Sequence, residues 1–284
     1  MKILVADSGA TKTDWRIINQ DGAIEQAKTI GFNPFYSEIG YFQQDIETQL
    51  YPLLDKYEVA EVHYYGAGCS NQKNQAIVAA MLKELFPKTQ AHVTHDLLAA
   101  ARALCGHEEG IACILGTGAN SCHYDGKVII NNVPSLAYVL GDFGSGSTMG
   151  KELLSAYFHK EMPEELAAKF DARFQLNRDE MIERIYKKPM AAAYLASFSK
   201  FLFDNSTHPF INDLIKSQFQ KFITHYVLPY QGAKNLKIHF TGSVAFYYNS
   251  MLRSVVEDMG LTVGIIVQAP IAGLTLYHQK NLNH

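Results

Sequence analysis

ILVADSGATKTDWRII, residues 3–18, places a turn of small and hydroxyl-bearing residues between two apolar runs. Short apolar runs on both sides of a Gly-containing turn are typical of paired β-strands, so we expect strands before and after residues 7–13. Such a turn exposes main-chain N–H groups and hydroxyls to an anion. Asp7, at the end of the first strand, is the kind of oxygen ligand that Mg²⁺ prefers. The stretch therefore indicates either a phosphate-binding turn or a plain hairpin.

Length and composition narrow the class of protein. The 284 residues are enough for one large domain or two ordinary ones, and 48% hydrophobic with 19% charged residues is typical of a compact globular chain. A net charge of −3 argues against a nucleic-acid partner. We expect no membrane partner either, because no apolar stretch approaches the roughly 18 residues of a membrane span.

The cysteines and the first residues of the chain indicate in which cellular compartment the protein is expected. The four cysteines form no C-x-x-C pair, and the histidines show no zinc-type spacing, so we expect no structural zinc or iron–sulfur site. The first residues resemble a strand rather than a secretory leader. These features favour a reduced, cytoplasmic protein.

The plan of residues 3–18 recurs later in the chain. Residues 111–121, IACILGTGANS, form an apolar run followed by a Gly/Thr turn and a second predicted strand. Asp-Gly pairs at 21–22 and 125–126 predict tight hairpins after each copy. Two such copies about one domain apart predict duplicated halves, joined near Gly106.

Hydrophobic periodicity between and after these copies alternates between strand and helix, which predicts the α/β class. Helices are expected at 42–54, 73–86 and 97–104, and strands at 62–66 and 91–94. Residues 151–230 are mostly helical in pattern, and strands are expected again at 236–240 and 262–267. A last helix over about 271–278 is expected to pack back on the first half.

Two further Gly-rich loops carry candidate residues. GDFGSGS at 141–147 is not a P-loop, because Ser145 and Glu152 stand where that motif needs Gly and Ser or Thr. Asp142 in this loop is either a sugar or metal ligand or a turn aspartate. At 240–245, Gly242 either lets a flat ring lie against the main chain or belongs to an ordinary strand-to-helix turn.

Two polar residues beside predicted strands complete the set. Asp96 follows the strand at 91–94 and is either a helix N-cap or a base that orients a hydroxyl toward a γ-phosphate. Asn33, in the loop 32–35, either caps a turn or clamps a neutral polar substrate.

In this order the motifs resemble those of the actin-like ATPase superfamily, which includes hexokinases, Hsp70 and actin. Residues 7–13 resemble its first phosphate motif, 115–120 its second and 241–243 its adenosine motif. Within that superfamily the chain is similar to the N-acetylglucosamine kinase group of the BadF/BadG/BcrA/BcrD ATPase family. This similarity rests on Gly31-Phe32-Asn33-Pro34, His95-Asp96, Gly116-Thr117-Gly118-Ala119-Asn120 and Gly141-Asp142-Phe143-Gly144-Ser145.

The resemblance implies two ribonuclease H-like lobes with mixed sheets flanked by helices and an ATP cleft between them. The first lobe would span 1–106, with the final helix 271–284 packing back on it. The second would span 107–270, with a helical insertion and most contacts to the nucleotide. The expected activity is an ATP-dependent sugar kinase that uses Mg²⁺, and a homodimer is left open.

The resemblance also assigns roles residue by residue. Asp96 would be the base, and Asp7 would serve the metal. The substrate-binding residues would be Asn33, Asn120 and Asp142. The nucleotide-binding residues would be Gly9, Thr11, Lys12, Thr13, Thr117, Gly118 and Gly242.

Departures from the family pattern keep the sugar and its reactive hydroxyl open. Residues 133–138, VPSLAY, stand where related kinases carry Gly-Gly-Trp-Gly, and Phe143 stands where they carry Glu. Two alternatives also remain. One is an ATPase that activates a reductase or dehydratase through a shared iron–sulfur cluster, although Cys105 and Cys122 lack the expected surrounding motifs. The other is a nucleotide-gated, non-enzymatic sugar sensor.

Overall fold

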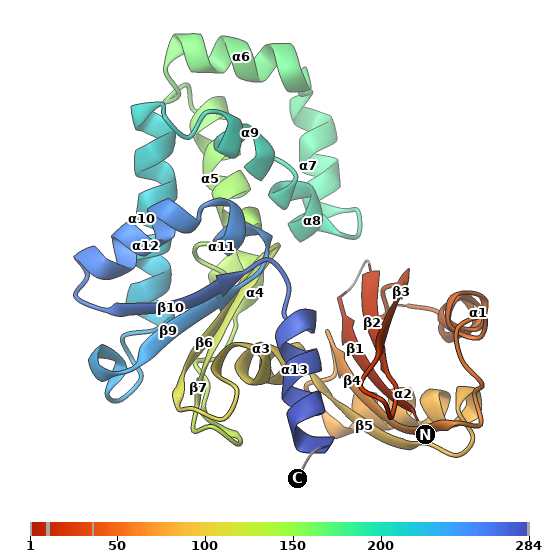
Figure 1. Cartoon of the computed structure of the whole chain (residues 1–284). Helices are drawn as coiled ribbons and strands as arrows, with labels where there is room; N and C mark the ends of the chain where they lie inside the picture. The colour runs from red at the N-terminus through yellow and green to blue at the C-terminus, as the bar shows by residue number, and fades with distance from the viewer. Residues whose placement is uncertain (1, 10–11, 36, 283–284) are drawn as a thin grey trace. The chain divides into compact units, whose positions relative to one another are not determined.

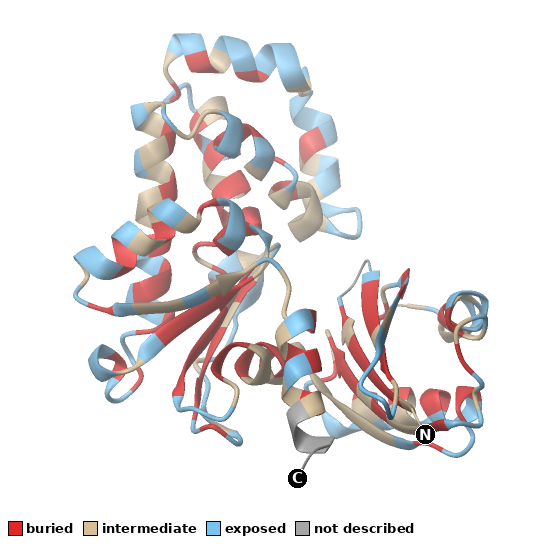
Figure 2. Ribbon diagram, in the orientation of Figure 1, coloured by how far each residue is buried: buried red, intermediate tan, exposed pale blue. Residues whose placement is uncertain are grey.

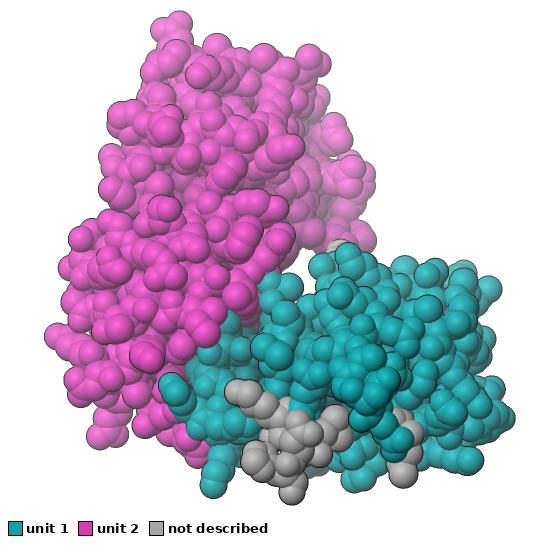
Figure 3. Space-filling view, in the orientation of Figure 1, with its two compact units in different colours: residues 1–108, 126–128, 269–284 teal, residues 109–125, 129–268 magenta. Residues whose placement is uncertain are grey.

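In the computed structural model, which describes residues 2–9, 12–35 and 37–282, the chain forms two compact units. Unit 1 comprises Met1–Glu108, Gly126–Val128 and Ala269–His284, and unit 2 comprises Glu109–Asp125 and Ile129–Gln268 (Figure 3). Each unit contains a five-stranded mixed sheet with helices packed on it (Figure 1). The predicted α/β fold with two mixed sheets is thereby confirmed.

The sheet of unit 1 has the strand order β3-β2-β1-β4-β5. Its strands are β1 (Lys2–Ser8), β2 (Lys12–Ile18), β3 (Ile24–Ile30), β4 (Val59–Gly66) and β5 (Gln90–His95). The first three are antiparallel neighbours, whereas β4 is parallel to β1 and β5 is parallel to β4. Helix α2 (Gln72–Leu85) connects the parallel strands β4 and β5, as a parallel connection requires.

Both faces of this sheet are buried, which explains the uninterrupted apolar run of β1. Side chains alternate along a strand, so Ile3 and Val5 point to the face that α3 (Asp96–Cys105) and α13 (Ile271–Leu282) cover. Leu4 and Ala6 point to the other face, where they pack with residues of α2 and α1 (Ile39–Leu50). Helix α13 packs on α3, β1 and β2, all within unit 1.

The sheet of unit 2 repeats the order of unit 1, as β8-β7-β6-β9-β10. Its strands are β6 (Gly110–Leu115), β7 (Ala119–Tyr124), β8 (Ile129–Asn131), β9 (Lys237–Thr241) and β10 (Thr262–Val267). The hairpin β6–β7 is antiparallel, and β9 and β10 are added in parallel. The duplication predicted from the two copies of the strand–turn–strand plan is therefore present in the topology.

A long helical segment separates β8 from β9. Its helices are α4 (Ala137–Leu140), α5 (Gly146–Phe158), α6 (Glu164–Phe174), α7 (Arg178–Tyr186), α8 (Ala191–Ala196), α9 (Ser199–Asp204) and α10 (Pro209–Tyr226). Helices α11 (Ser243–Tyr247) and α12 (Asn249–Asp258) lie between β9 and β10. One core joins these helices to the sheet through Met149, Phe219 and Phe240, among others, and Figure 2 shows the buried faces.

Most predicted elements are present, with shifted ends. The helix expected at 42–54 runs from Ile39 to Leu50, and the helix expected at 97–104 runs from Asp96 to Cys105. Strand β3 was not predicted, because it is an edge strand in which only Ala27 and Thr29 are buried. Among the described residues, no helix is both long and apolar enough to cross a membrane.

Candidate functional site

The carboxyl ends of the parallel strands of unit 1 carry two acidic residues. Asp7 lies near the end of β1 and pairs with Tyr65 of β4, which in turn pairs with Thr94 of β5. Asp96 follows β5 directly as the first residue of α3. Because carboxyl ends of parallel strands meet at one edge of a sheet, Asp7 and Asp96 lie at the same edge.

The electrostatics of these two carboxyls are coupled. Burial, followed by the Asp96 carboxylate, raises the pKa of Asp7 to about 7. Burial also raises the pKa of Asp96, opposed by His95 and by the main-chain N–H groups of Leu97 and Asp96. Half-buried carboxylates that repel each other favour a bound proton or a cation. As oxygen donors they fit a hard ion such as Mg²⁺.

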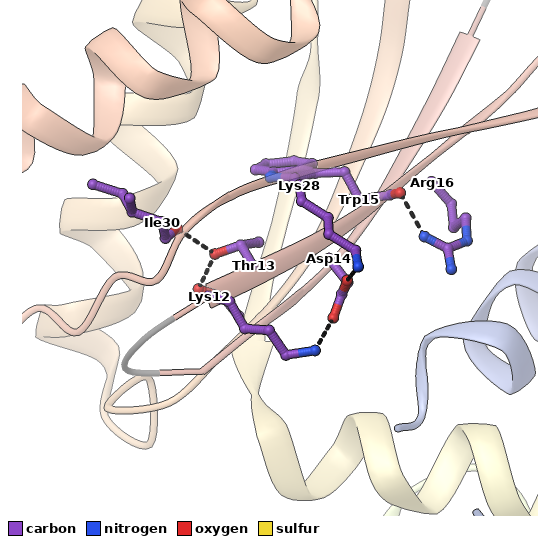
Figure 4. A network of polar contacts seen from close by, with 8 residues as sticks. Lys12, Thr13, Asp14, Trp15, Arg16, Lys28 and Ile30 are labelled. Atoms are coloured by element: carbon purple, nitrogen blue, oxygen red, sulfur yellow. Dashed lines mark hydrogen bonds and ion pairs between the residues drawn. The ribbon is translucent and has the colours of Figure 1, made fainter. Parts of the chain in front are cut away.

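In the turn between β1 and β2, the predicted ligands Gly9 and Lys12 are exposed, whereas Thr13 is buried. The N–H of Gly9 donates to the carbonyl oxygen of Lys12 at 2.9 Å, which closes the turn, and both residues are exposed. Lys12 Nζ lies 2.8 Å from Asp14 Oδ2 (Figure 4). Thr11 lies outside the described residues.

Thr13 in the same turn faces inward. It is fully buried, its Oγ1 lies 2.7 Å from Ser8 Oγ, and it donates to the carbonyl oxygen of Ile30 at 3.0 Å (Figure 4). The hydroxyl of Thr13 thus holds β1, β2 and β3 together. The hydroxyl of Thr13 is thus engaged within the sheet, and its predicted contact with a nucleotide stays a prediction.

Asn33 shapes the loop that follows β3. Its Oδ1 accepts the N–H of Phe35 at 3.1 Å, and its own N–H donates to Ser37 Oγ at 3.0 Å. Gly68 lies against it so closely that a Cβ there would be 2.4 Å from Asn33 Oδ1. Asn33 is buried and forms the turn, whereas its predicted contact with a substrate stays a prediction.

In unit 2 the turn between β6 and β7 is tied to the start of α5. The N–H of Gly116 donates to the carbonyl oxygen of Gly118, while the carbonyl of Gly116 accepts the N–H of Gly146 at 2.8 Å. The carbonyl of Thr117 accepts the N–H of Ser147 at 3.1 Å. The side chain of Thr117 is exposed, which leaves it accessible to a ligand.

Asp142 lies directly on this turn. Its Oδ1 accepts the N–H of Ala119 at 3.2 Å and the hydroxyl of Ser135 at 3.3 Å, and a Cβ on Gly118 would be 3.0 Å from its Oδ2. Its φ of 54° is in the left-handed region, which few non-glycine residues adopt. Burial raises its pKa, against the effect of the Ala119 N–H.

Asn120, the third predicted substrate ligand, uses its side chain locally. Its Oδ1 accepts the N–H of Ser121 at 2.9 Å and Nδ2 of Asn132 at 3.2 Å. Asn132 also donates to the carbonyl oxygen of Ser121 at 2.6 Å. The structure therefore places Thr117, Gly118 and Asp142 together, with Asn120 bonded to the loop that follows β8.

Gly242, between β9 and α11, permits a close approach of two chain segments. Its φ is 114°, and a Cβ there would be 2.3 Å from the carbonyl oxygen of Leu115. No other residue fits this position without moving the main chain.

A cavity of about 460 Å³ opens beside Gly242. It is lined by α11, with Ser243 and Tyr247, and by α9, with Lys200, Phe203 and Asp204. The predictions did not include these residues of α9, because they lie about forty positions before Gly242 in an ordinary helical pattern. The local sequence signal for this cavity was the aromatic pair Tyr247-Tyr248, which follows Gly242 closely.

Comparisons with known proteins agree with this fold. No family model matches the chain, and curated proteins gave no match. A solved structure from Porphyromonas gingivalis, of a protein named by inference as an N-acetylglucosamine kinase, is 38% identical with a TM-score of 0.91. The match covers 98% of this chain and 99% of that chain.

Two more distant structures share the fold. A protein of Chromobacterium violaceum that carries the same inferred name is 15% identical, with a TM-score of 0.73 over 97% of this chain and 98% of that chain. A ROK family glucokinase from Streptomyces griseus, solved with glucose and AMPPNP, is 13% identical, with a TM-score of 0.56 over 99% of both chains. These two structures share the fold, and the 38% identity to the Porphyromonas gingivalis protein over nearly the whole chain shows that the chain belongs to the N-acetylglucosamine kinase-like family.

Proposed function

We propose that this protein transfers the γ-phosphoryl group of ATP to a hydroxyl of an amino sugar such as N-acetylglucosamine. Within the superfamily we assign it to the BadF/BadG/BcrA/BcrD ATPases. The observation that carries the proposal is the pair Asp7 and Asp96, two half-buried carboxyls with raised pKa values at one sheet edge. The name of the relative that is 38% identical supports the class of substrate.

Asp96 would act as the general base. A base works best when its pKa lies near the working pH, and burial shifts the pKa of Asp96 upward, toward neutrality. The main-chain N–H groups of Asp96 and Leu97 hydrogen-bond its carboxylate and hold it in place at the start of α3. Asp96 would take the proton of the sugar hydroxyl as that oxygen attacks phosphorus in line.

Unit 2 would hold the nucleotide. The cavity beside Gly242 is large enough for a purine ring, with Phe203 and Tyr247 as aromatic walls. In unit 2, the exposed Thr117 and the main chain of Gly118 would bind phosphate oxygens. In unit 1, the exposed Gly9 and Lys12 are proposed as further ligands of the nucleotide.

Asp7 would serve Mg²⁺, since its carboxyl is already repelled by Asp96 and a cation relieves that repulsion. When bound, Mg²⁺ neutralises charge that develops on the phosphates. Asp142 and Asn33 would bind the sugar, with Asn120 supporting the loop beside Asp142. Asp142 is the strongest of these candidates, because its carboxylate contacts the β6–β7 turn itself.

The alternative in which the chain activates a reductase has less support. All four cysteines are buried, and burial raises the pKa values of Cys69 and Cys105 to about 12. Thiols in that state are poor ligands for a shared iron–sulfur cluster.

The test is a coupled assay of ADP release with hexoses, N-acetylglucosamine and N-acetylmuramic acid as acceptors. We expect one amino sugar to stimulate turnover, and Asp96→Asn to lower kcat by about 10²- to 10⁴-fold with little change in the sugar KM. Asp213→Asn, an exposed aspartate of α10, is the matched control and should keep full activity. Turnover that no sugar stimulates, or an Asp96→Asn protein with full activity, would refute the proposal.

A further inference from the structure

Three potential metal ligands share one face of the unit 1 sheet. Glu61 and His63 are two residues apart on β4, so their side chains point to the same side. His92 on β5 pairs directly with His63 in the parallel register. The topology thus brings two imidazoles and a carboxylate together from neighbouring strands.

The distances within this cluster suit a metal ion after a small adjustment. Glu61 Oε2 lies 2.9 Å from His63 Nε2 and 4.0 Å from His92 Nε2, and all three ligand atoms lie within 4.8 Å of one another. Ligand atoms around a tetrahedral Zn²⁺ are about 3.3 Å apart, so His92 needs to turn inward by roughly 1 Å. Its ring stacks on that of His63 with centroids 4.8 Å apart, and its side chain is 41% exposed, which leaves room on the solvent side for the ring to turn and leaves the site open to solvent.

The surroundings hold His63 in position. Its ring stacks on His278 of α13 with centroids 4.0 Å apart, and His278 Nε2 lies 2.8 Å from the hydroxyl of Tyr65. Arg102 donates to that hydroxyl at 2.8 Å.

This cluster is distinct from the proposed kinase site. Glu61 and His63 precede the end of β4 at Gly66 by five and three residues, which is about 10–17 Å along a strand. Asp7 and Asp96 lie at that end. Two imidazoles and one carboxylate also form a different donor set from oxygen-only Mg²⁺ sites, and they favour zinc and related transition metals.

We propose that Glu61, His63 and His92 bind a divalent transition-metal ion, with Zn²⁺ as the first choice and a fourth position open to water. The ion would link β4 to β5. The proposal does not depend on the proposed kinase activity.

The test uses the full chain without a histidine tag, freed of metal with EDTA and titrated with Zn²⁺ against a chromophoric chelator. We expect one Zn²⁺ per chain. His92→Ala and Glu61→Gln should each weaken binding by more than about 100-fold, beyond the 10- to 100-fold typical of a lost second-shell partner. His159→Ala, an exposed histidine of unit 2, is the matched control and should bind as tightly as the parent.

A second readout separates lost binding from lost folding. Zn²⁺ should raise the Tm of the parent and of His159→Ala, because an ion that binds only the folded state stabilises it. It should leave the Tm of His92→Ala unchanged while the circular dichroism of that variant matches the parent. The proposal is overturned if the parent binds no Zn²⁺, or if folded His92→Ala and Glu61→Gln bind it as tightly as the parent.

Discussion

The carboxylate of Asp142 accepts a hydrogen bond from the main-chain N–H of Ala119 at 3.2 Å, across 23 positions of sequence. This bond joins the loop before α5 to the turn between β6 and β7. The glycines of each segment predicted a separate loop, and the hydrogen bond shows that the two loops contact each other. Asp142 therefore has a structural role in addition to the sugar contact proposed for it.

Asp142→Ala and Asp142→Asn should separate these two roles. Alanine leaves the buried N–H of Ala119 without its acceptor and adopts φ of 54° poorly, so we expect a loss of about 2–4 kcal/mol in unfolding free energy. Asparagine keeps an acceptor and tolerates that backbone, so its loss should be about 1 kcal/mol. Chemical denaturation measures both. If Asp142 also binds sugar, Asp142→Asn should raise the sugar KM; equal stability of the two variants would contradict the structural role.

Gly242→Ala should lower the stability of the folded protein far more than Gly232→Ala. Both glycines have positive φ, 114° and 76°, but a Cβ at 242 would meet the Leu115 carbonyl at 2.3 Å, whereas position 232 is open. We expect Gly232→Ala to cost about 1 kcal/mol from backbone strain alone and Gly242→Ala at least about 2 kcal/mol more. Thermal unfolding of the two variants side by side tests this, and similar Tm values would count against the close approach.

Thr117→Val and Thr13→Val form a pair with opposite expected effects. Thr117 is exposed, so losing its hydroxyl should leave stability unchanged and weaken ATP binding by about 2- to 10-fold. The hydroxyl of Thr13 is buried between Ser8 and Ile30, so its loss should cost about 1–3 kcal/mol of stability and leave the Kd for ATP unchanged. Calorimetric titration with ATP and denaturation of both variants measure these effects. Weaker ATP binding by Thr13→Val would indicate that Thr13 contacts the nucleotide in addition to holding the strands.

Phe203→Ala tests the proposed adenine pocket. An aromatic wall that stacks on a base contributes about 1–3 kcal/mol, so the Kd for ATP should rise by about 5- to 100-fold. Phe246→Ala is the control, because Phe246 has the same 43% exposure and lies on α11 without lining the cavity. Equal nucleotide affinities for the two variants would place adenine elsewhere.

Unit 1 should lose stability in mild acid through His278. Burial, then His63 and Arg102, lower the pKa of His278 to about 2, against 6.5 for an ordinary histidine. The folded state therefore keeps His278 neutral while the unfolded state takes up a proton below about pH 6.5. Stability should fall by about 1 kcal/mol per pH unit from there down to about pH 4. The ring of His278 contacts Tyr65 and His63, and His92 is a further histidine whose charge acts on it.

The measurement is thermal unfolding at pH 7 and pH 5 in the presence of EDTA. His278→Phe keeps a ring in the stack without a titrating group, so its Tm should change less between the two pH values. Identical pH dependence of parent and variant would show that His278 is not the group responsible.

Much of the fold follows from local signals. The strand ends of β10 match the prediction, and β1, β2, β6 and β7 follow from apolar runs around Gly-containing turns. Such signals act within a few residues, where backbone preference and side-chain alternation are sufficient. Strand β3 lacks them, because an edge strand with one exposed face is mostly polar.

The candidate site, like the fold, follows only in part from local sequence signals. The sequence by itself determined the repeated strand–turn–strand plan and the placement of Asp7 and Asp96 at strand ends. Only the tertiary structure decided that Thr13 faces the interior while Lys12 faces solvent, since two polar neighbours on a strand carry no sign of which side is buried. It alone also decided that Asp142 accepts from Ala119, that α9 closes a cavity beside α11, and that His63 and His92 lie side by side. These contacts depend on chain segments that meet only when the sheet assembles, and no local propensity encodes them.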